Sequence, residues 1–278
     1  MNCERIYLDN EGGYIDTYIS DPIANLTRKA ILVIPGGGYH AVCSDREGEP
    51  IAQAFIPYGY QAFVLHYYVE AEKPFPIQLI QVAKAIKHIK DNAEKYGIDP
   101  ENVFVVGFSA GGHLAASSGI LWKYPGVSDA VDAQFGYVRP TGVMLVYPVI
   151  SGTEDFKHSG SIYNLLATKE PTEEQAMTVS VEKHVDEDSA PAFIVHTSND
   201  QIVDVRNSLA LGAAYREAGL KFELHVFPDG PHGWGLGTAV TSVGKEKFII
   251  SAASEWVRMA SVWADGVIAE NESKKLEG

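Results

Sequence analysis

Short apolar runs alternate along the chain with longer amphipathic segments. The apolar runs predict buried strands at 30–34, 61–67, 102–107, 142–147, 192–197 and 221–227. Strands that are apolar almost throughout are typical of a parallel sheet with helices on both faces. Two runs at 4–8 and 13–19 also carry Glu, Asp and Thr. They predict an antiparallel pair at one edge of the sheet.

The amphipathic segments predict helices at 77–96, 110–122, 205–218 and 244–263. Gly97 follows the first of them and suits a left-handed C-terminal cap. The polar and acidic segment 151–189 breaks the alternation and predicts an insertion. We therefore expect one domain over 1–278 with an α/β fold, built on a mostly parallel twisted sheet of about eight strands, and a small insertion at about 151–189.

Composition and charge narrow the function. The 278 residues are 46% hydrophobic and 10% aromatic, which is typical of a globular protein with a large core. The chain has 22 basic and 36 acidic residues. The resulting net charge of −14 disfavours binding to nucleic acid or anionic membrane surfaces.

Neither Cys3 nor Cys43 lies in a metal-binding pattern, and no metal or organic cofactor is predicted. The start lacks the apolar run of a secretion signal, so we expect a cytoplasmic protein. A homo-oligomer is compatible with the sequence.

A candidate nucleophile follows the apolar run at 102–107. Residues 107–111 read Gly-Phe-Ser-Ala-Gly and stand directly between a predicted strand and a predicted helix. A serine on such a sharp turn is lifted clear of the sheet, and the flanking glycines relieve the crowding. The pattern alone is common by chance. Its place between strand and helix makes Ser109 the predicted nucleophile.

A candidate oxyanion hole follows the run at 30–34. Pro35 is followed by Gly36, Gly37 and Gly38, whose backbone N–H groups can approach developing negative charge closely. The glycines do not match a phosphate-binding or dinucleotide-binding pattern. With Ser109 downstream, an oxyanion loop is therefore favoured over a phosphate-binding or simply flexible loop.

The histidine and the acid come from two later loops. His232 lies in a turn-rich loop after the last apolar run, where a base can reach a neighbouring strand end. His113 stands four residues after Ser109 on the same helix and is expected only to pack or hydrogen-bond. Asp200 and Asp204 compete to orient the base. Asp200 is favoured because it stands just past a strand end, whereas Asp204 suits a helix N-cap.

With these residues placed, the chain resembles the α/β-hydrolases. It is most similar to bacterial carboxylesterases and acetyl-xylan-esterase-like sugar esterases related to the prolyl oligopeptidase catalytic domain. The resemblance is carried by PGGGYHAVCSDREGEPIA at 35–52, GFSAGGHLAA at 107–116, HTSNDQIVDVRNS at 196–208 and PDGPHGWGL at 228–236. It implies an α/β-hydrolase fold and a serine esterase that uses Ser109, Asp200 and His232 on a small-molecule ester. It also implies an oxyanion hole built by the backbone of Ala110 with Gly37 and Gly38.

Departures from related patterns refine that expectation. Pro35 stands where hormone-sensitive-lipase-like relatives have histidine, which favours the sugar-esterase side. Asp204 stands where relatives usually have proline after the acid's short turn. No room remains for a β-propeller gate, so hydrolysis of short acyl esters is favoured over cleavage of amide or peptide bonds, with a catalytically inert binding protein as a further alternative. Side chains expected to contact substrate, with packing an equal alternative for the tyrosines, are Tyr39, His40, Tyr67, Tyr147 and Trp234.

Overall fold

The computed structural model describes residues 1–69 and 73–277. Its centre is an eight-stranded sheet in the order β1-β2-β4-β3-β5-β6-β7-β8. The strands from β4 to β8 along this order pair in parallel, while β2 pairs antiparallel with both β1 and β4. This confirms the mostly parallel sheet and the antiparallel pair at one edge. The strands are β1 (Arg5–Tyr7), β2 (Tyr14–Tyr18), β3 (Arg28–Ile34), β4 (Tyr60–His66), β5 (Ile98–Phe108), β6 (Gly142–Val146), β7 (Ala192–Thr197) and β8 (Phe222–Phe227).

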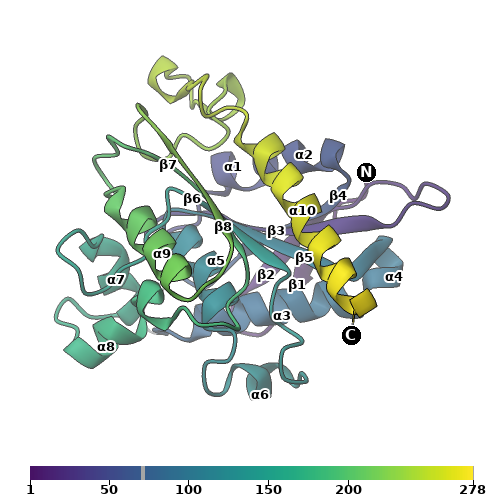
Figure 1. Ribbon diagram of the computed structural model, residues 1–278, viewed down its shortest axis with the longest axis horizontal. Helices are drawn as coiled ribbons and strands as arrows, with labels where there is room; N and C mark the ends of the chain where they lie inside the picture. Colours follow the sequence, from purple (N-terminus) through teal and green to yellow (C-terminus); the bar gives the residue numbers. More distant parts are fainter. Residues whose placement is uncertain (70–72, 278) are drawn as a thin grey trace.

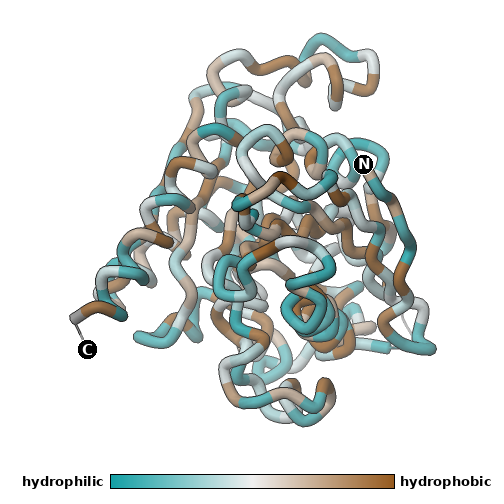
Figure 2. The backbone as a smooth tube through the Cα atoms, turned by 90° about the vertical axis from the view of Figure 1, so that its right-hand side faces the viewer, coloured by the Kyte–Doolittle hydropathy of each residue, from teal (hydrophilic) through white to brown (hydrophobic). Residues whose placement is uncertain are grey.

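Alternation along the strands divides the core into two apolar clusters. In β3, Leu32 and Ile34 belong to one cluster, whereas Ile31 and Val33 belong to the other. Successive side chains of a strand point to opposite faces, so both faces of β3 need apolar cover. Figure 2 shows the result, with largely apolar strands in the middle and mixed positions along the outer helices and loops.

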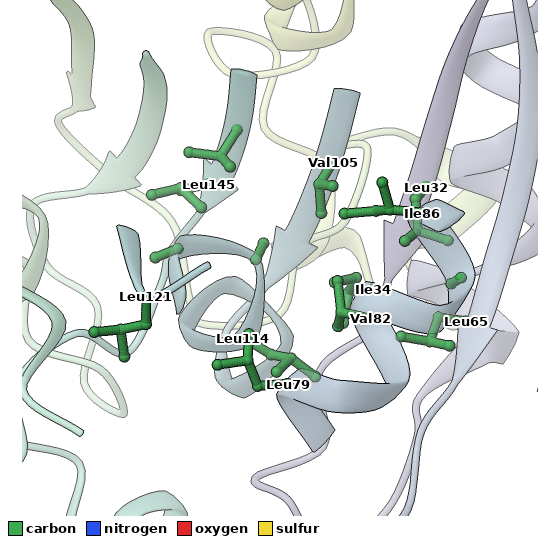
Figure 3. Packing of buried hydrophobic residues seen from close by; sticks show 14 of the residues in the cluster. Leu32, Ile34, Leu65, Leu79, Val82, Ile86, Val105, Leu114, Leu121 and Leu145 are labelled. Atoms are coloured by element: carbon green, nitrogen blue, oxygen red, sulfur yellow. The ribbon is translucent and has the colours of Figure 1, made fainter. Parts of the chain in front are cut away.

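Helices cover the two faces unequally (Figure 1). On one face α3, α5 and α9 contact the sheet, and on the other α2 and α10 do. Figure 3 shows Leu79, Val82 and Ile86 of α3 packed with Leu114 of α5 beneath the strands. The helices are α1 (Ser44–Glu47), α2 (Glu49–Phe55), α3 (Ile77–Asp91), α4 (Ala93–Tyr96), α5 (Ala110–Ile120), α6 (Val127–Val131), α7 (Ser159–Leu166), α8 (Glu173–Thr178), α9 (Arg206–Glu217) and α10 (Trp256–Glu277), with 3₁₀ turns η1 (Ile56–Tyr58), η2 (Val181–His184), η3 (Ala239–Thr241) and η4 (Glu246–Phe248).

Two helix predictions need correction. The helix expected at 77–96 is interrupted at Asn92, whose side-chain amide donates to the carbonyl of His88 and ends α3. The helix expected at 244–263 begins only at Trp256. Residues before it pack their apolar side chains against the loop at 230–237, as Ile250 does, and therefore do not continue the helix. The left-handed cap at Gly97 is confirmed by its φ of 62°.

The parallel strands end at one edge of the sheet, and the candidate residues follow these ends. The glycine loop follows β3, Ser109 follows β5, Asp200 follows β7 and His232 follows β8. In parallel α/β sheets the carboxyl edge is where ligands bind. The segment 151–189 lies between β6 and β7 and forms α7, α8 and η2 at the same edge. The fold therefore collects the predicted chemistry on one side of the molecule.

The start of α5 lies so close to β3 that only glycine fits there. A β-carbon on Gly111 would stand 2.2 Å from the Ile34 carbonyl oxygen and 2.3 Å from that of Pro35. We expect Gly111→Ala to lower the free energy of unfolding by about 1–3 kcal/mol, because backbone atoms must move apart. Gly266→Ala in α10 is the matched control, since nothing lies within 4 Å of its β-carbon. It is expected to stabilise by about 0.5–1 kcal/mol.

Urea unfolding of both variants measures the two effects. Equal effects of the two substitutions would contradict the close packing of α5 on β3.

Candidate active site

Ser109 occupies a strained turn between β5 and α5. Its φ is 55° and its ψ is −118°, a conformation that costs a non-glycine residue about 1–3 kcal/mol. Three backbone hydrogen bonds hold it there. The Ser109 N–H donates to the Val146 carbonyl at 3.0 Å, and the Ser109 carbonyl accepts from the N–H groups of His113 and Val149. The turn is thus fixed from β6 as well as from α5, and it holds the side chain at the edge of the sheet.

His232 contacts both of its predicted partners. Its Nε2 lies 2.7 Å from the Oγ of Ser109, and its Nδ1 lies 2.7 Å from the Oδ2 of Asp200. The ring also packs edge-on against Tyr147, with centroids 4.9 Å apart. The structure therefore brings the predicted serine, imidazole and carboxylate into one chain of hydrogen bonds, in the geometry by which a base activates a hydroxyl.

The carboxylate of Asp200 is buried and fully engaged. Its Oδ1 accepts from the N–H groups of Ile202 and Val203, and its Oδ2 also lies 3.4 Å from the Nε2 of His196. Burial by itself raises the pKa of Asp200, but the hydrogen bonds from His196 and His232 outweigh it and hold the pKa below its usual value. A charged carboxylate here accepts the Nδ1–H of His232 and orients the ring.

Asp204, the competing acid, is used elsewhere. Its Oδ1 accepts a hydrogen bond from the backbone N–H of Arg206 at 2.9 Å, at the start of α9. Its Oδ2 accepts one from the guanidinium of the same residue. The predicted N-cap role needs correction, because the N-cap of α9 is Val205 and Asp204 bonds to Arg206 from one residue before it. Asp204 therefore ties down the loop that carries Asp200 and has no contact with His232.

The glycine loop presents free backbone donors beside Ser109. Gly36 is so near that a β-carbon on it would stand 3.0 Å from the β-carbon of Ser109. Gly37 and Gly38 have φ values of 127° and 66°. Together with Ala110, the first residue of α5, they have N–H groups without a partner among the described residues. Free N–H groups at a helix start and in a glycine turn suit a developing oxyanion.

Glu47 fixes the glycine loop by a hydrogen bond at Gly36. Its carboxyl is buried, with Oε2 accepting the Gly36 N–H and Oε1 accepting the Tyr147 hydroxyl, both at 2.8 Å. The Tyr147 hydroxyl in turn accepts the N–H of Gly235, in the loop that carries His232. Burial raises the pKa of Glu47, and the hydrogen bonds oppose that rise. One carboxyl thus joins the glycine loop to the histidine loop.

His113 holds the loop from the opposite side. Its Nε2 donates to the Val179 carbonyl and its Nδ1 accepts from the Tyr39 hydroxyl, each at 2.8 Å. Burial lowers the pKa of His113 to about 4, so the ring stays neutral and can accept from the hydroxyl. The expectation that His113 packs and hydrogen-bonds is confirmed. Through it, Tyr39 of the glycine loop is tied to the insertion.

The insertion also reaches the glycine loop directly. Asn164 of α7 donates to the Gly38 carbonyl at 2.8 Å. His158 forms the N-cap of the same helix and is half-buried. Burial lowers the pKa of His158, which favours a neutral imidazole beside the site. Helix α7 therefore forms one wall of the site.

The expected substrate contacts need correction. Trp234 and Tyr147 have no exposed surface, and Tyr39 and Tyr67 are only 2% and 3% exposed. Their side chains support the loops, as the Tyr67 hydroxyl does by donating to the Pro35 carbonyl. The prediction of substrate contact is wrong for these four side chains. Their role is the packing that was the alternative for the tyrosines. His40 is exposed beside the glycine loop and stays a prediction.

Glu47, Asn164 and His158 were missed from the sequence. The motif at 35–52 contains Glu47, but no local pattern shows that its carboxyl turns back under Gly36. In the sequence His158 looks like a surface histidine, because its contacts form only when the insertion folds against the site.

Across residues 1–69 and 73–277, no group of three His, Cys, Asp or Glu side chains could hold a metal ion. No helix in the same part of the chain is long and apolar enough to cross a membrane.

The BD-FAE family model matches residues 15–215, which include Ser109 and Asp200. The chain belongs to the BD-FAE family. It is 37% identical over 83% of its length to endo-1,4-beta-xylanase B of Butyrivibrio fibrisolvens, and 30% identical over 77% to an acetylxylan esterase of Xylanibacter ruminicola. The chain spans only 37% of the length of the first of these relatives and 42% of the length of the second.

Solved structures match this BD-FAE member along nearly its whole length. An acetyl ester-xyloside bifunctional hydrolase from Caldicellulosiruptor lactoaceticus is 31% identical, with a TM-score of 0.81 and 95% of this chain and 96% of that chain covered. MGS-M1, an alpha/beta hydrolase from a Medee basin deep-sea metagenome library, is 32% identical, with a TM-score of 0.78 and coverage of 97% and 98%. The fold is that of the α/β-hydrolases.

We expect Glu47→Gln to lower kcat/KM for an ester about ten- to hundredfold in this BD-FAE member. Glutamine has a single acceptor oxygen and cannot accept from both the Gly36 N–H and the Tyr147 hydroxyl. Its N–H₂ group then faces one of these two donors, and the glycine loop shifts. Asp45→Asn in the same short helix is the control, because Asp45 is exposed and its nearest ion-pair contact, with Arg46, is 3.9 Å long. Initial rates with p-nitrophenyl acetate measure the effect, and a Gln variant within twofold of wild type would contradict the clamp.

Acid should destabilise the protein partly through His113. Its pKa is about 4 when folded and 6.5 ordinarily, so the unfolded chain binds a proton first and stability falls as the pH drops from 6.5 toward 4. At pH 5 the loss from this group is about 2 kcal/mol. His113→Gln, although less stable at pH 7.5, should lose correspondingly less between pH 7.5 and 5. Urea unfolding at both pH values tests this, and equal losses for the two proteins would contradict it.

Proposed function

We propose that the chain is a serine carboxylic-ester hydrolase in which Ser109 is the nucleophile, His232 the base and Asp200 the residue that orients the base. The observation that carries this proposal is the continuous hydrogen-bond chain, with 2.7 Å on each side of the His232 ring. The names of the relatives agree with it, since an acetylxylan esterase and an acetyl ester-xyloside hydrolase are among them.

The reaction follows from the positions of these groups. The Nε2 of His232 takes the Ser109 proton as Oγ bonds to the ester carbonyl carbon, and the carbonyl oxygen becomes an oxyanion. The N–H groups of Gly38 and Ala110, with Gly37 nearby, donate to that oxyanion. When the tetrahedral intermediate collapses, the C–O bond to the alcohol breaks and His232 protonates the leaving oxygen.

Water completes the cycle in the proposed mechanism. His232 takes a proton from water as the water oxygen attacks the acyl-enzyme carbonyl, and it returns a proton to Ser109 Oγ as the acid leaves. Asp200 remains ionised throughout, because its hydrogen bonds hold its pKa low. No cofactor enters any step.

The proposed substrates are short acyl esters of small polyhydroxylated alcohols, with acetylated xylosides as the leading case. Two observations support this class. Relatives with these names cover most of the chain, and polar side chains of α7 border the site. Amide or short-peptide hydrolysis is the alternative, and a side-by-side rate with an aminoacyl-nitroanilide separates it from ester hydrolysis.

Ser109→Ala should lower kcat for p-nitrophenyl acetate by at least about 10³-fold, because the acyl-enzyme can no longer form. Ser273→Ala is the control, since Ser273 is exposed in α10 and its hydroxyl donates to the Ala269 carbonyl of the same helix. A fluorophosphonate probe should label the wild-type protein and leave the Ser109→Ala variant unlabelled. Equal rates for Ser109→Ala and wild type, or labelling of both, would defeat the assignment and favour an inert binding protein or another nucleophile.

A further inference from the structure

The first part of the insertion is tied to the loop that carries Asp200. The side-chain amide of Asn207, at the start of α9, donates to the Phe156 carbonyl at 3.2 Å. Its neighbour Arg206 contacts the Asp155 carboxylate at 3.2 Å. These contacts hold residues 155 and 156 next to the acid loop. The insertion therefore starts on the His232–Asp200 side of the site.

The next turn of the insertion lies on the opposite side of Ser109. Asn164 donates to the Gly38 carbonyl at 2.8 Å, and the hydroxyl of Ser161 lies 3.8 Å from where a β-carbon on Gly38 would be. His158 stands between the two anchored stretches as the N-cap of α7. His158 therefore lies on the stretch of chain that runs from the acid loop to the glycine loop.

The ring of His158 has one engaged nitrogen and one free nitrogen. Its Nδ1 lies 2.8 Å from the Ser161 hydroxyl and accepts the Ser161 N–H at 3.3 Å. A backbone N–H can only donate, so Nδ1 carries the lone pair and Nε2 carries the proton. The Nε2–H has no partner among the residues that the structure describes. Burial lowers the pKa of His158 and favours this neutral form.

We propose that His158 binds the alcohol half of the substrate by donating its Nε2–H to a hydroxyl or ring oxygen of a polyhydroxylated leaving group. This inference rests on the proposed function. His232 protonates the departing alcohol, so the alcohol half lies on the His232 side of Ser109. His158 follows by two residues the stretch that is anchored next to the acid loop. The acyl oxygen lies on the side of Gly38. His158 is a specificity residue, because an alcohol without such an oxygen gains nothing from its N–H.

Two substitutions separate the N–H donor from the helix cap. His158→Asn keeps a strong N-cap that can accept the Ser161 N–H, but its side chain ends near the position of Nδ1. His158→Gln is longer and carries an N–H at about the reach of Nε2. Thermal unfolding of the Asn variant should match wild type and shows that α7 is intact.

The experiment compares two substrates for wild type and both variants. One is a mono-O-acetylated methyl xyloside, whose alcohol half offers hydroxyl and ring oxygens, and the other is p-nitrophenyl acetate, which has the same acyl group and no hydroxyl. The measured quantity is the ratio of kcat/KM for the xyloside ester to that for p-nitrophenyl acetate. We expect His158→Asn to lower this ratio roughly five- to tenfold, the effect of one hydrogen bond, and His158→Gln to restore much of it.

An Asn variant with a ratio within twofold of wild type would overturn the role of His158. A ratio that stays equally low in the Gln variant would do the same, because the loss would not follow the N–H. Wild-type turnover of p-nitrophenyl acetate without turnover of the xyloside ester would overturn this inference and leave the esterase intact. No turnover of either ester, with Ser109 unlabelled by a fluorophosphonate, would instead sink the proposed function.

Discussion

The imidazole of His232 has to touch two groups at once, and those groups come from loops far apart in the sequence. Ser109 lies 123 residues before it and Asp200 lies 32 residues before it, yet each is 2.7 Å from a ring nitrogen. Only a rigid scaffold can keep both distances short. The parallel strands β5, β7 and β8 supply it, because their carboxyl ends lie along one edge and each carries one of the three residues.

Polar contacts, two of them buried, keep the glycine loop at this edge in place. The glycine loop is held at Gly36 by Glu47, through Tyr39 by His113, and at the Gly38 carbonyl by Asn164. Burying a carboxyl and an imidazole costs free energy, which their hydrogen bonds offset. Donors held in place before the reaction need no reorganisation when charge develops on the substrate. The same contacts link the glycine loop to the insertion and to the loop of His232.

Much of this arrangement could be predicted from local sequence patterns. The apolar runs predicted each strand, and the strand–Ser109–helix junction predicted the turn, because both depend on neighbouring residues. The helix prediction at 244–263 failed at its start because Ile250 packs on the loop at 230–237, a contact that the helical pattern does not show. Glu47 and His158 could not be found this way, since what they contact is decided by how the loops fold together. The prediction that Trp234 contacts substrate failed because the sequence around His232 does not show whether a neighbouring aromatic side chain is exposed or buried.

The central claim is that Ser109 attacks a carbonyl whose oxygen then rests against the glycine loop and the start of α5. A crystal structure of the protein after reaction with an alkyl fluorophosphonate tests this most directly. The predicted result is a covalent bond from Ser109 Oγ to phosphorus, with the phosphoryl oxygen about 2.7–3.1 Å from the backbone nitrogens of Gly38 and Ala110. An adduct on another side chain, or a phosphoryl oxygen turned away from both nitrogens, would contradict it.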